Sequence, residues 1–140
     1  CRTSAGCQYG CFSSDAGDTW TRPEPTVFKS PCSPASIKRI PSTGDLLAIW
    51  NDHSGRFPLA PPVQSTGTRT PLVAAISRDD GRSWQRHRLI EDDPTCGFCY
   101  IAIHFVEAAV LLAYCAGDRS TNGILNRLRM RRMSLDWFYA

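Results

Sequence analysis

The sequence predicts an all-β fold made of successive antiparallel hairpins. Its apolar residues come in short runs separated by turn residues, as in 36–52, where two strands flank a turn at 42–45. Residues 124–139 alternate apolar and polar side chains with the period of two that is typical of a strand. No stretch combines helical spacing with capping residues, so we expect strands and turns to dominate.

The remaining hairpins follow the same plan. Residues 70–90 are expected to form a strand, a turn at 79–81 and a second strand. Residues 99–117 contain apolar runs on both sides of Glu107. Between the first two hairpins lies the longest loop, 53–68, which is rich in Pro, Gly, Ser and Thr. Because long loops on a compact scaffold are often functional, we expect this loop to contribute to a site.

The totals indicate one soluble globular domain. The chain has 140 residues, of which 42% are hydrophobic and 21% charged, and is long enough to bury a core. The net charge of +3 gives no argument for nucleic acid. No apolar run is long enough to span a membrane, so we expect no membrane span, and we expect no signal peptide within these residues. Most of the positive excess comes from 126–135, which we interpret as the solvated face of a strand, with a binding patch as the alternative.

Seven cysteines are an odd number, so they cannot all pair with one another. Their apolar, strand-like settings suit free thiols, which behave as small buried hydrophobes. Cys96 and Cys99 form a CxxC pair, but a zinc site needs four ligands and no second pair lies at suitable spacing. We therefore expect no metal site and no cofactor, while the redox compartment stays open.

An eight-residue pattern, Ser-x-Asp-x-Gly-x-(Thr/Ser)-Trp, occurs at 13–20 and again at 77–84. Each copy falls on the turn of a hairpin. The Asp and Ser side chains can bond the backbone of their own turn, Gly permits positive φ, and Trp can bury its ring between strands. The residues expected to do this are Ser13, Asp15, Gly17, Trp20, Ser77, Asp79, Gly81 and Trp84.

The pattern has a functional alternative, which is calcium binding. Asp15 with Asp18, or Asp79 with Asp80, would supply the carboxylates. Two carboxylates per turn make a weak calcium site, so we interpret the pattern as a structural pin of the hairpin. Its recurrence in units of four strands predicts the blades of a β-propeller. We expect one partial domain over 1–140, with blade ends near 1–30, a blade over 31–95 and the start of a blade over 96–140.

The repeated pattern resembles the Asp box, also called the bacterial neuraminidase repeat, and the whole chain is similar to the later part of a sialidase. The resemblance implies a six-bladed propeller, of which 140 residues cover about two and a half four-stranded blades. A blade needs neighbours on both faces. The resemblance therefore implies that the missing N-terminal blades of the same propeller are partners of this chain.

Sialidases hold the carboxylate of the substrate with three arginines from different blades. The resemblance assigns this role to Arg2, before the first Asp box, and to Arg69, at the start of the strand leading into the second. Planar guanidinium groups bind a carboxylate bidentately and stay charged. Arg56 in the long loop is an alternative to Arg69, and both could be surface charges instead. Arg39 lies in an Arg-Ile-Pro sequence, which resembles the motif that carries the first arginine of sialidases. Because it lies between the two Asp boxes, we interpret it as a strand residue instead.

The resemblance makes Tyr100, near the start of a blade, the catalytic nucleophile. A buried strand aromatic is the structural alternative. The base that would deprotonate the tyrosine is expected upstream of Cys1, and within the chain Glu91 is the substitute. Because two aspartates follow Glu91, a solvated carboxylate is its alternative interpretation. Asp52 and His53, at the start of the long loop, are candidate substrate contacts.

The expected function is that of the C-terminal part of an exo-sialidase-like retaining glycoside hydrolase that releases terminal sialic acid. The general acid, the base and one arginine are expected upstream, so the isolated chain should be inactive. One alternative is a non-catalytic propeller that binds sialic acid or other glycans. A structural Asp-box propeller with protein partners is another. Bacterial-style sialidases are often exported, as secreted or periplasmic enzymes, but no residue here shows export.

Overall fold

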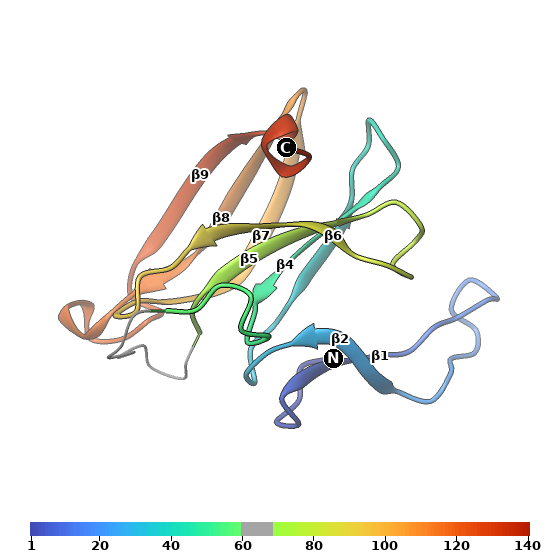
Figure 1. Cartoon of the computed structure of the whole chain (residues 1–140), viewed down its shortest axis with the longest axis horizontal. Helices are drawn as coiled ribbons and strands as arrows, with labels where there is room; N and C mark the ends of the chain where they lie inside the picture. Colours follow the sequence, from blue (N-terminus) through green and yellow to red (C-terminus); the bar gives the residue numbers. More distant parts are fainter. Residues whose placement is uncertain (60–68) are drawn as a thin grey trace.

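The computed structural model describes residues 1–59 and 69–140, and within them the strands form three antiparallel sheets (Figure 1). The first sheet contains β1 (Cys7–Gly10) and β2 (Glu24–Lys29). The second contains β3 (Ser36–Arg39), β4 (Leu46–Asn51), β5 (Leu72–Ser77) and β6 (Gln85–Glu91). The third contains β7 (Gly97–Val106), β8 (Ala109–Gly117) and β9 (Leu128–Ser134). The all-β prediction is confirmed.

Within the described residues, two short 3-10 helices supplement the strands. They are η2 (Arg119–Thr121) and η3 (Leu135–Phe138). The second corrects the prediction of one alternating strand over 124–139, because Ser134 ends β9 by accepting a hydrogen bond from the backbone N–H of Asp136 at 3.2 Å. In the described part of the chain, no helix has the length and apolar character needed to cross a membrane.

The second sheet is the centre of the molecule, because the other two sheets pack on its opposite faces (Figure 1). On one face Leu47 and Ile76 join a core shared with Phe98 and Leu112 of the third sheet. On the other face Phe28 of β2 packs against Trp50 and Val73 of the second sheet. This double covering explains why β5 is buried along its whole length and reads as a continuous apolar run.

Polar contacts also join the second and third sheets. The hydroxyl of Ser36 donates to the carbonyl of Ile101 at 2.6 Å, and the amide of Asn51 donates to the carbonyl of Phe98 at 3.0 Å. Buried polar groups of this kind need partners, and here each finds one on the neighbouring sheet. The contacts fix the position of β7 relative to β3 and β4.

In β9 two apolar side chains face solvent and two arginines face inward, which is the opposite of the prediction. Leu128 and Met130 are 76% and 72% exposed, whereas Arg129 and Arg131 turn inward and pair with Glu91. The interpretation of 126–135 as a solvated face was therefore wrong for Arg129 and Arg131, whereas Arg127 and Arg132 are exposed. The reason is long-range, since a buried carboxylate on β6 attracts the charged side of the strand.

Because neighbouring strands run antiparallel, their connections alternate between two ends of the sheets. The two Asp-box turns, which join β1 to β2 and β5 to β6, lie at one end. The segments that lead into β1, β5 and β7 lie at the other. Of the loop predicted over 53–68, residues 60–68 lie outside the described residues.

Candidate functional site

The second Asp box forms a hydrogen-bonded turn between β5 and β6. The hydroxyl of Ser77 donates to Asp79 at 2.8 Å and accepts from the backbone N–H of Gly81 at 2.8 Å. The carboxylate of Asp79 also accepts from the backbone N–H of Ser83 at 2.8 Å. The first box makes the same bonds with equivalent residues, Ser13, Asp15, Gly17 and Thr19. Each box thus satisfies the backbone of its own turn.

These hydrogen bonds already engage the carboxylates of Asp15 and Asp79, which a calcium site in either turn would need as ligands. The side chain of Ser83 is the main cause that lowers the pKa of Asp79 to about 2, and that of Thr19 lowers the pKa of Asp15 further. Asp80 forms an ion pair with Arg39 at 2.8 Å. Arg39, the last residue of β3, therefore lies beside the Asp-box turn and away from Tyr100. Among the described residues no group of three or more His, Cys, Asp and Glu could hold a metal ion.

The tryptophans of the two boxes have different surroundings. Trp84 is half-buried, and its ring centroid lies 4.9 Å from that of Phe28, which itself lies 4.8 Å from Trp50. Trp20 is 61% exposed, although its Nε1 donates to the carbonyl of Gly17 at 2.9 Å. The prediction that both rings are buried was wrong for Trp20. In the described residues no sheet precedes β1 and β2 to cover it.

At the other end of the sheets, Arg2 and Arg69 both reach Tyr100. The Cζ atom of Arg69 lies 5.4 Å from the centroid of the Tyr100 ring. Side-chain hydrogen bonds from Arg2 and then from Arg69, together with their charges, lower the pKa of Tyr100. Tyr100 is 50% exposed, so it is not the buried aromatic of the alternative interpretation. The structure brings these three side chains together from three separate segments.

The backbone of Tyr100 is unusual. Its φ of 56° lies in the left-handed region, where a bulky residue is rare. It sits in a bulge, because the pairing of β7 with β8 shifts between Cys99 and Ala102. Such a conformation costs on the order of 1–3 kcal/mol, and bulges often re-aim a side chain at a functional site. Here the bulge turns the phenol away from the core and towards the two arginines.

Arg69 is held by both its backbone and its side chain. Its carbonyl accepts a hydrogen bond from the N–H of Phe98 at 2.7 Å, which ties the segment before β5 to the start of β7. Burial acts to lower the pKa of Arg69, but hydrogen bonds to Cys99 and Tyr100 raise it overall. The guanidinium therefore stays charged beside the phenol.

A cavity of about 460 Å³ adjoins this pair. It is lined by Arg69, Tyr100 and the loop 122–126. Leu125 in this loop is 55% exposed and gives the cavity an apolar side, while Asn122 and Asn126 offer amide groups. The cavity thus combines a cation, a phenol, an apolar surface and neutral hydrogen-bonding groups, which suits a carboxylated polar ligand.

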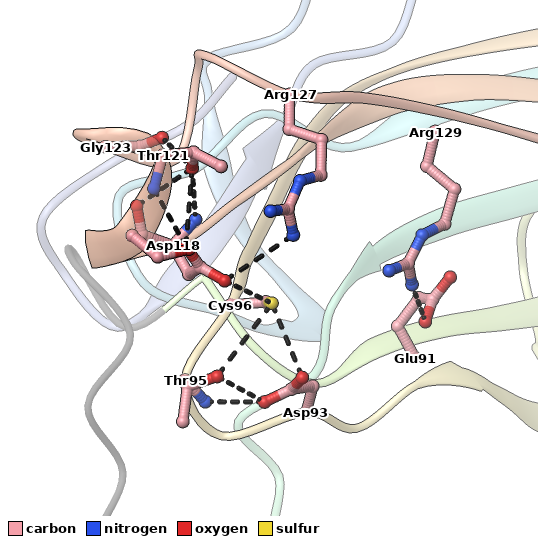
Figure 2. A network of polar contacts seen from close by, with 10 residues as sticks. Glu91, Asp93, Thr95, Cys96, Asp118, Thr121, Gly123, Arg127 and Arg129 are labelled. Atoms are coloured by element: carbon pink, nitrogen blue, oxygen red, sulfur yellow. Dashed lines mark hydrogen bonds and ion pairs between the residues drawn. The ribbon is translucent and has the colours of Figure 1, made fainter.

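The loop 122–126, which forms one wall of this cavity, is fixed by a polar network. Figure 2 shows the thiol of Cys96 between Asp93 and Asp118, at 3.4 Å and 4.0 Å from their carboxylates. Asp118 caps η2 through Thr121 and pairs with Arg127 at 3.5 Å. The turn before β7 and both ends of the loop after β8 are therefore linked.

Two glycines let the loop approach the sheet closely. A Cβ added to Gly97 would lie 2.4 Å from the side chain of Ile124, and one added to Gly117 would lie 2.3 Å from the carbonyl of Gly123. Gly97 and Gly117 face each other across β7 and β8. Sequence reasoning did not find this wall. The only signal was a glycine at each of these strand ends, which marks a close backbone approach.

Glu91 lies in a different network from Tyr100. It is 6% exposed and accepts a hydrogen bond from Tyr114, with Arg129 at 2.6 Å and Arg131 at 2.9 Å (Figure 2 shows the Arg129 pair). The interpretation of Glu91 as a solvated carboxylate is thus wrong. Burial, and then the bond to Glu91, raise the pKa of Tyr114. This arrangement neutralises a buried carboxylate and joins β6, β8 and β9.

Asp52 and its neighbours form a local turn at the end of β4. The buried carboxylate of Asp52 accepts from the N–H and the hydroxyl of Ser54, both at 2.9 Å, and pairs with Arg56 at 3.0 Å. Arg56 is thereby directed to Asp52, whereas Arg69 is directed to Tyr100. His53 lies between the two regions, with Nε2 at 3.1 Å from the carbonyl of Thr70.

With this geometry established, the comparisons with known proteins identify the family. Over residues 1–112 the chain matches the BNR repeat-like domain, and it therefore belongs to that family. The Asp-box assignment made from the repeated pattern is confirmed, and the match supports the sialidase-type superfamily. No curated protein matches the chain.

Proposed function

We propose that this chain is the C-terminal part of an exo-sialidase-like retaining glycoside hydrolase that releases terminal sialic acid. The observation that carries the proposal is the convergence of Arg2 and Arg69 on the hydroxyl of Tyr100. Membership of the BNR repeat-like family is compatible with a glycoside hydrolase. No other described cluster combines two guanidinium groups with an exposed phenol.

The two arginines suit a ligand that carries a carboxylate. Hydrogen bonds between charged groups contribute about 1.5–3 kcal/mol each, and a guanidinium can make two of them to one carboxylate. A sugar whose carboxylate lies on Arg2 and Arg69 places its anomeric carbon near Tyr100, because the carboxylate of sialic acid is attached to that carbon. The cavity beside Arg69 receives the rest of the sugar.

Tyr100 suits the role of nucleophile for such a sugar. A carboxylate nucleophile would be repelled by the carboxylate of the substrate, whereas a phenol is neutral until it is deprotonated. The arginines lower the pKa of Tyr100 and so favour the phenolate that attacks the anomeric carbon. Water then hydrolyses the covalent tyrosyl intermediate, and the configuration of the sugar is retained.

Glu91 is not proposed as the base. Its carboxylate is already engaged by Tyr114, Arg129 and Arg131, and its role is to hold three strands together. The general acid, the base and the third arginine are proposed to come from blades that precede this chain in a six-bladed propeller. Those blades would also cover the sheet faces that carry Trp20, Leu128 and Met130, which are exposed here.

A non-catalytic glycan-binding propeller is the second candidate. The observation that favours it is that no described carboxylate contacts Tyr100, while both arginines do. Such a protein would bind sialic acid through Arg2 and Arg69 without cleaving it.

Binding of free sialic acid to the chain, measured by ligand-observed NMR with galactose as the neutral control, tests the proposal. We expect Arg69→Ala to weaken binding by about tenfold or more, because it removes a charged hydrogen-bonding partner. Arg39→Ala is the matched control, since it removes a surface arginine at the Asp-box end. Equal binding of the two sugars, or equal effects of the two variants, would contradict the proposal.

A second measurement separates the enzyme from the binding protein. A parent chain that includes the preceding blades is incubated with a fluorogenic sialoside. For the enzyme we expect hydrolysis that Tyr100→Phe abolishes while sialic acid still binds, because only the nucleophile is removed. Binding without hydrolysis by the unmodified parent would instead identify the glycan-binding propeller.

A further inference from the structure

Two of the seven cysteines face each other across a pair of strands. Cys99 on β7 is directly opposite Cys115 on β8. Opposite residues of an antiparallel pair have Cα atoms about 4.5–5.5 Å apart and direct their side chains to the same face. Disulfides span Cα separations of about 4.4–6.8 Å. The backbone therefore already has the spacing that a disulfide requires.

The side chains are also close to one another, because the Cys99 thiol is, after burial, a cause of the raised pKa of Cys115. Cys99 is fully buried, whereas Cys115 is partly exposed and accessible to a small reagent. The CxxC partner of Cys99 is engaged elsewhere, because the Cys96 thiol is directed at Asp93 and Asp118 (Figure 2). The cysteines that the fold brings together are thus not the two of the CxxC pattern.

The charge beside the pair suits thiol chemistry. The guanidinium of Arg69 lies beside Cys99, and its charge opposes the increase in the pKa of Cys115 that burial and the Cys99 thiol cause. Burial, together with the Cys99 thiol, raises the pKa of Cys115. We therefore expect the reaction to be faster at alkaline pH, where more of the thiolate is present.

We propose that Cys99 and Cys115 are a modification site, at which a peroxide converts the two thiols into a cross-strand disulfide. The Cys115 thiol releases its proton, the thiolate attacks one peroxide oxygen, and the O–O bond breaks to give a sulfenic acid and hydroxide, which takes up the released proton to become water. The Cys99 thiol then attacks the sulfenic sulfur, the S–S bond forms, and a second water leaves. The two thiols lose two electrons in total, and hydrogen peroxide accepts them.

The bond would form immediately before the bulge that directs Tyr100. It would also convert the sulfur of Cys99, which contacts Arg69, from a thiol into half of a disulfide. The modification site therefore adjoins the candidate functional site, although its existence does not depend on the proposed function.

The test treats the whole chain with hydrogen peroxide, alkylates the remaining thiols and maps peptides by mass spectrometry without reduction. We expect a Cys99–Cys115 linked peptide, lighter than the two free peptides by two hydrogen atoms and split by dithiothreitol. In Cys115→Ser and Cys115→Ala the linked peptide is absent. Cys32→Ser, which removes an exposed thiol, retains it.

Two results would overturn the proposal. In one, Cys99 and Cys115 stay fully alkylated under conditions that oxidise the exposed Cys1 and Cys32. In the other, Cys115 forms its bond with a different cysteine or with a second copy of the chain. Both results are measured on the wild-type chain, so the conclusion does not depend on how well the variants fold.

Discussion

The two Asp boxes share the hydrogen bonds of their Ser, Asp and Gly residues but have different surroundings. In both, a serine hydroxyl bonds the glycine N–H at 2.8 Å. Trp84 lies against Phe28 of the first sheet, whereas Trp20 is 61% exposed. The turn is therefore made by its own eight residues, while the contribution of the tryptophan depends on a neighbouring sheet. Local chemistry and packing between sheets can thus be measured separately in one molecule.

Replacing the tryptophans should give the largest difference between the boxes. We expect Trp84→Ala to lower the free energy of unfolding by roughly 2 kcal/mol, because a half-buried ring leaves a cavity against Phe28. Trp20→Ala should lower it by about 0.5 kcal/mol, since most of its ring is already in water. Urea unfolding followed by circular dichroism measures both. Equal losses would show that neighbouring sheets do not set the contribution of the ring.

Replacing the glycines should have a smaller effect, of the same size in both boxes. Gly17 and Gly81 have φ of 103° and 87°, which L-residues rarely adopt. We expect Gly17→Ala and Gly81→Ala each to lower the free energy of unfolding by about 1 kcal/mol in the same assay. The added methyl of Gly81→Ala meets Trp84 at 3.7 Å, an ordinary contact, so strain rather than collision is the cause. A large effect in only one box would mean that the turn depends on its sheet.

The aspartates should give the smallest effect, visible through its pH dependence. Hydrogen bonds lower the pKa of Asp79 from 3.8 to about 2 in the folded chain. A lowered folded pKa stabilises the fold above pH about 3.8, and this stabilisation is lost as the pH falls towards about 2. We expect the gap in urea midpoint between the wild type and Asp79→Asn to be constant near neutral pH and to shrink below pH about 4.

Asp15→Asn serves as the partner measurement in the first box. The pKa of Asp15 is lowered further than that of Asp79, mainly by the side chain of Thr19. Its gap from the wild type should therefore persist to a lower pH. A gap that is independent of pH in both variants would contradict the role of these hydrogen bonds.

Much of the fold could be predicted because its determinants are local. The apolar runs of β4 and β5 indicated buried strands, and the repeated pattern located both Asp-box turns. The inward turn of Arg129 and Arg131 could not be predicted from β9 itself. It depends on Glu91, which is buried although two aspartates follow it and suggest a solvated segment.

The candidate site was predicted only as far as residue order allows. The resemblance to sialidases assigned Arg2, Arg69 and Tyr100 to one expected site by their order relative to the Asp boxes, and the structure brings the three side chains together. The wall formed by 122–126 was missed, because it depends on two glycines whose role appears only when the loop is in place. The bulge at Tyr100 was missed for the same reason.

The bulge adds one residue to β7 relative to β8. Two residues, Tyr100 and Ile101, lie opposite the single Tyr114, so Phe98 before the bulge and Ile103 after it face the same core. Removing one residue here would leave a regular strand that keeps the pairings on both sides of the bulge and the inward faces of Phe98 and Ile103. The extra residue thus lets β7 direct a tyrosine outward without changing which later side chains enter the core.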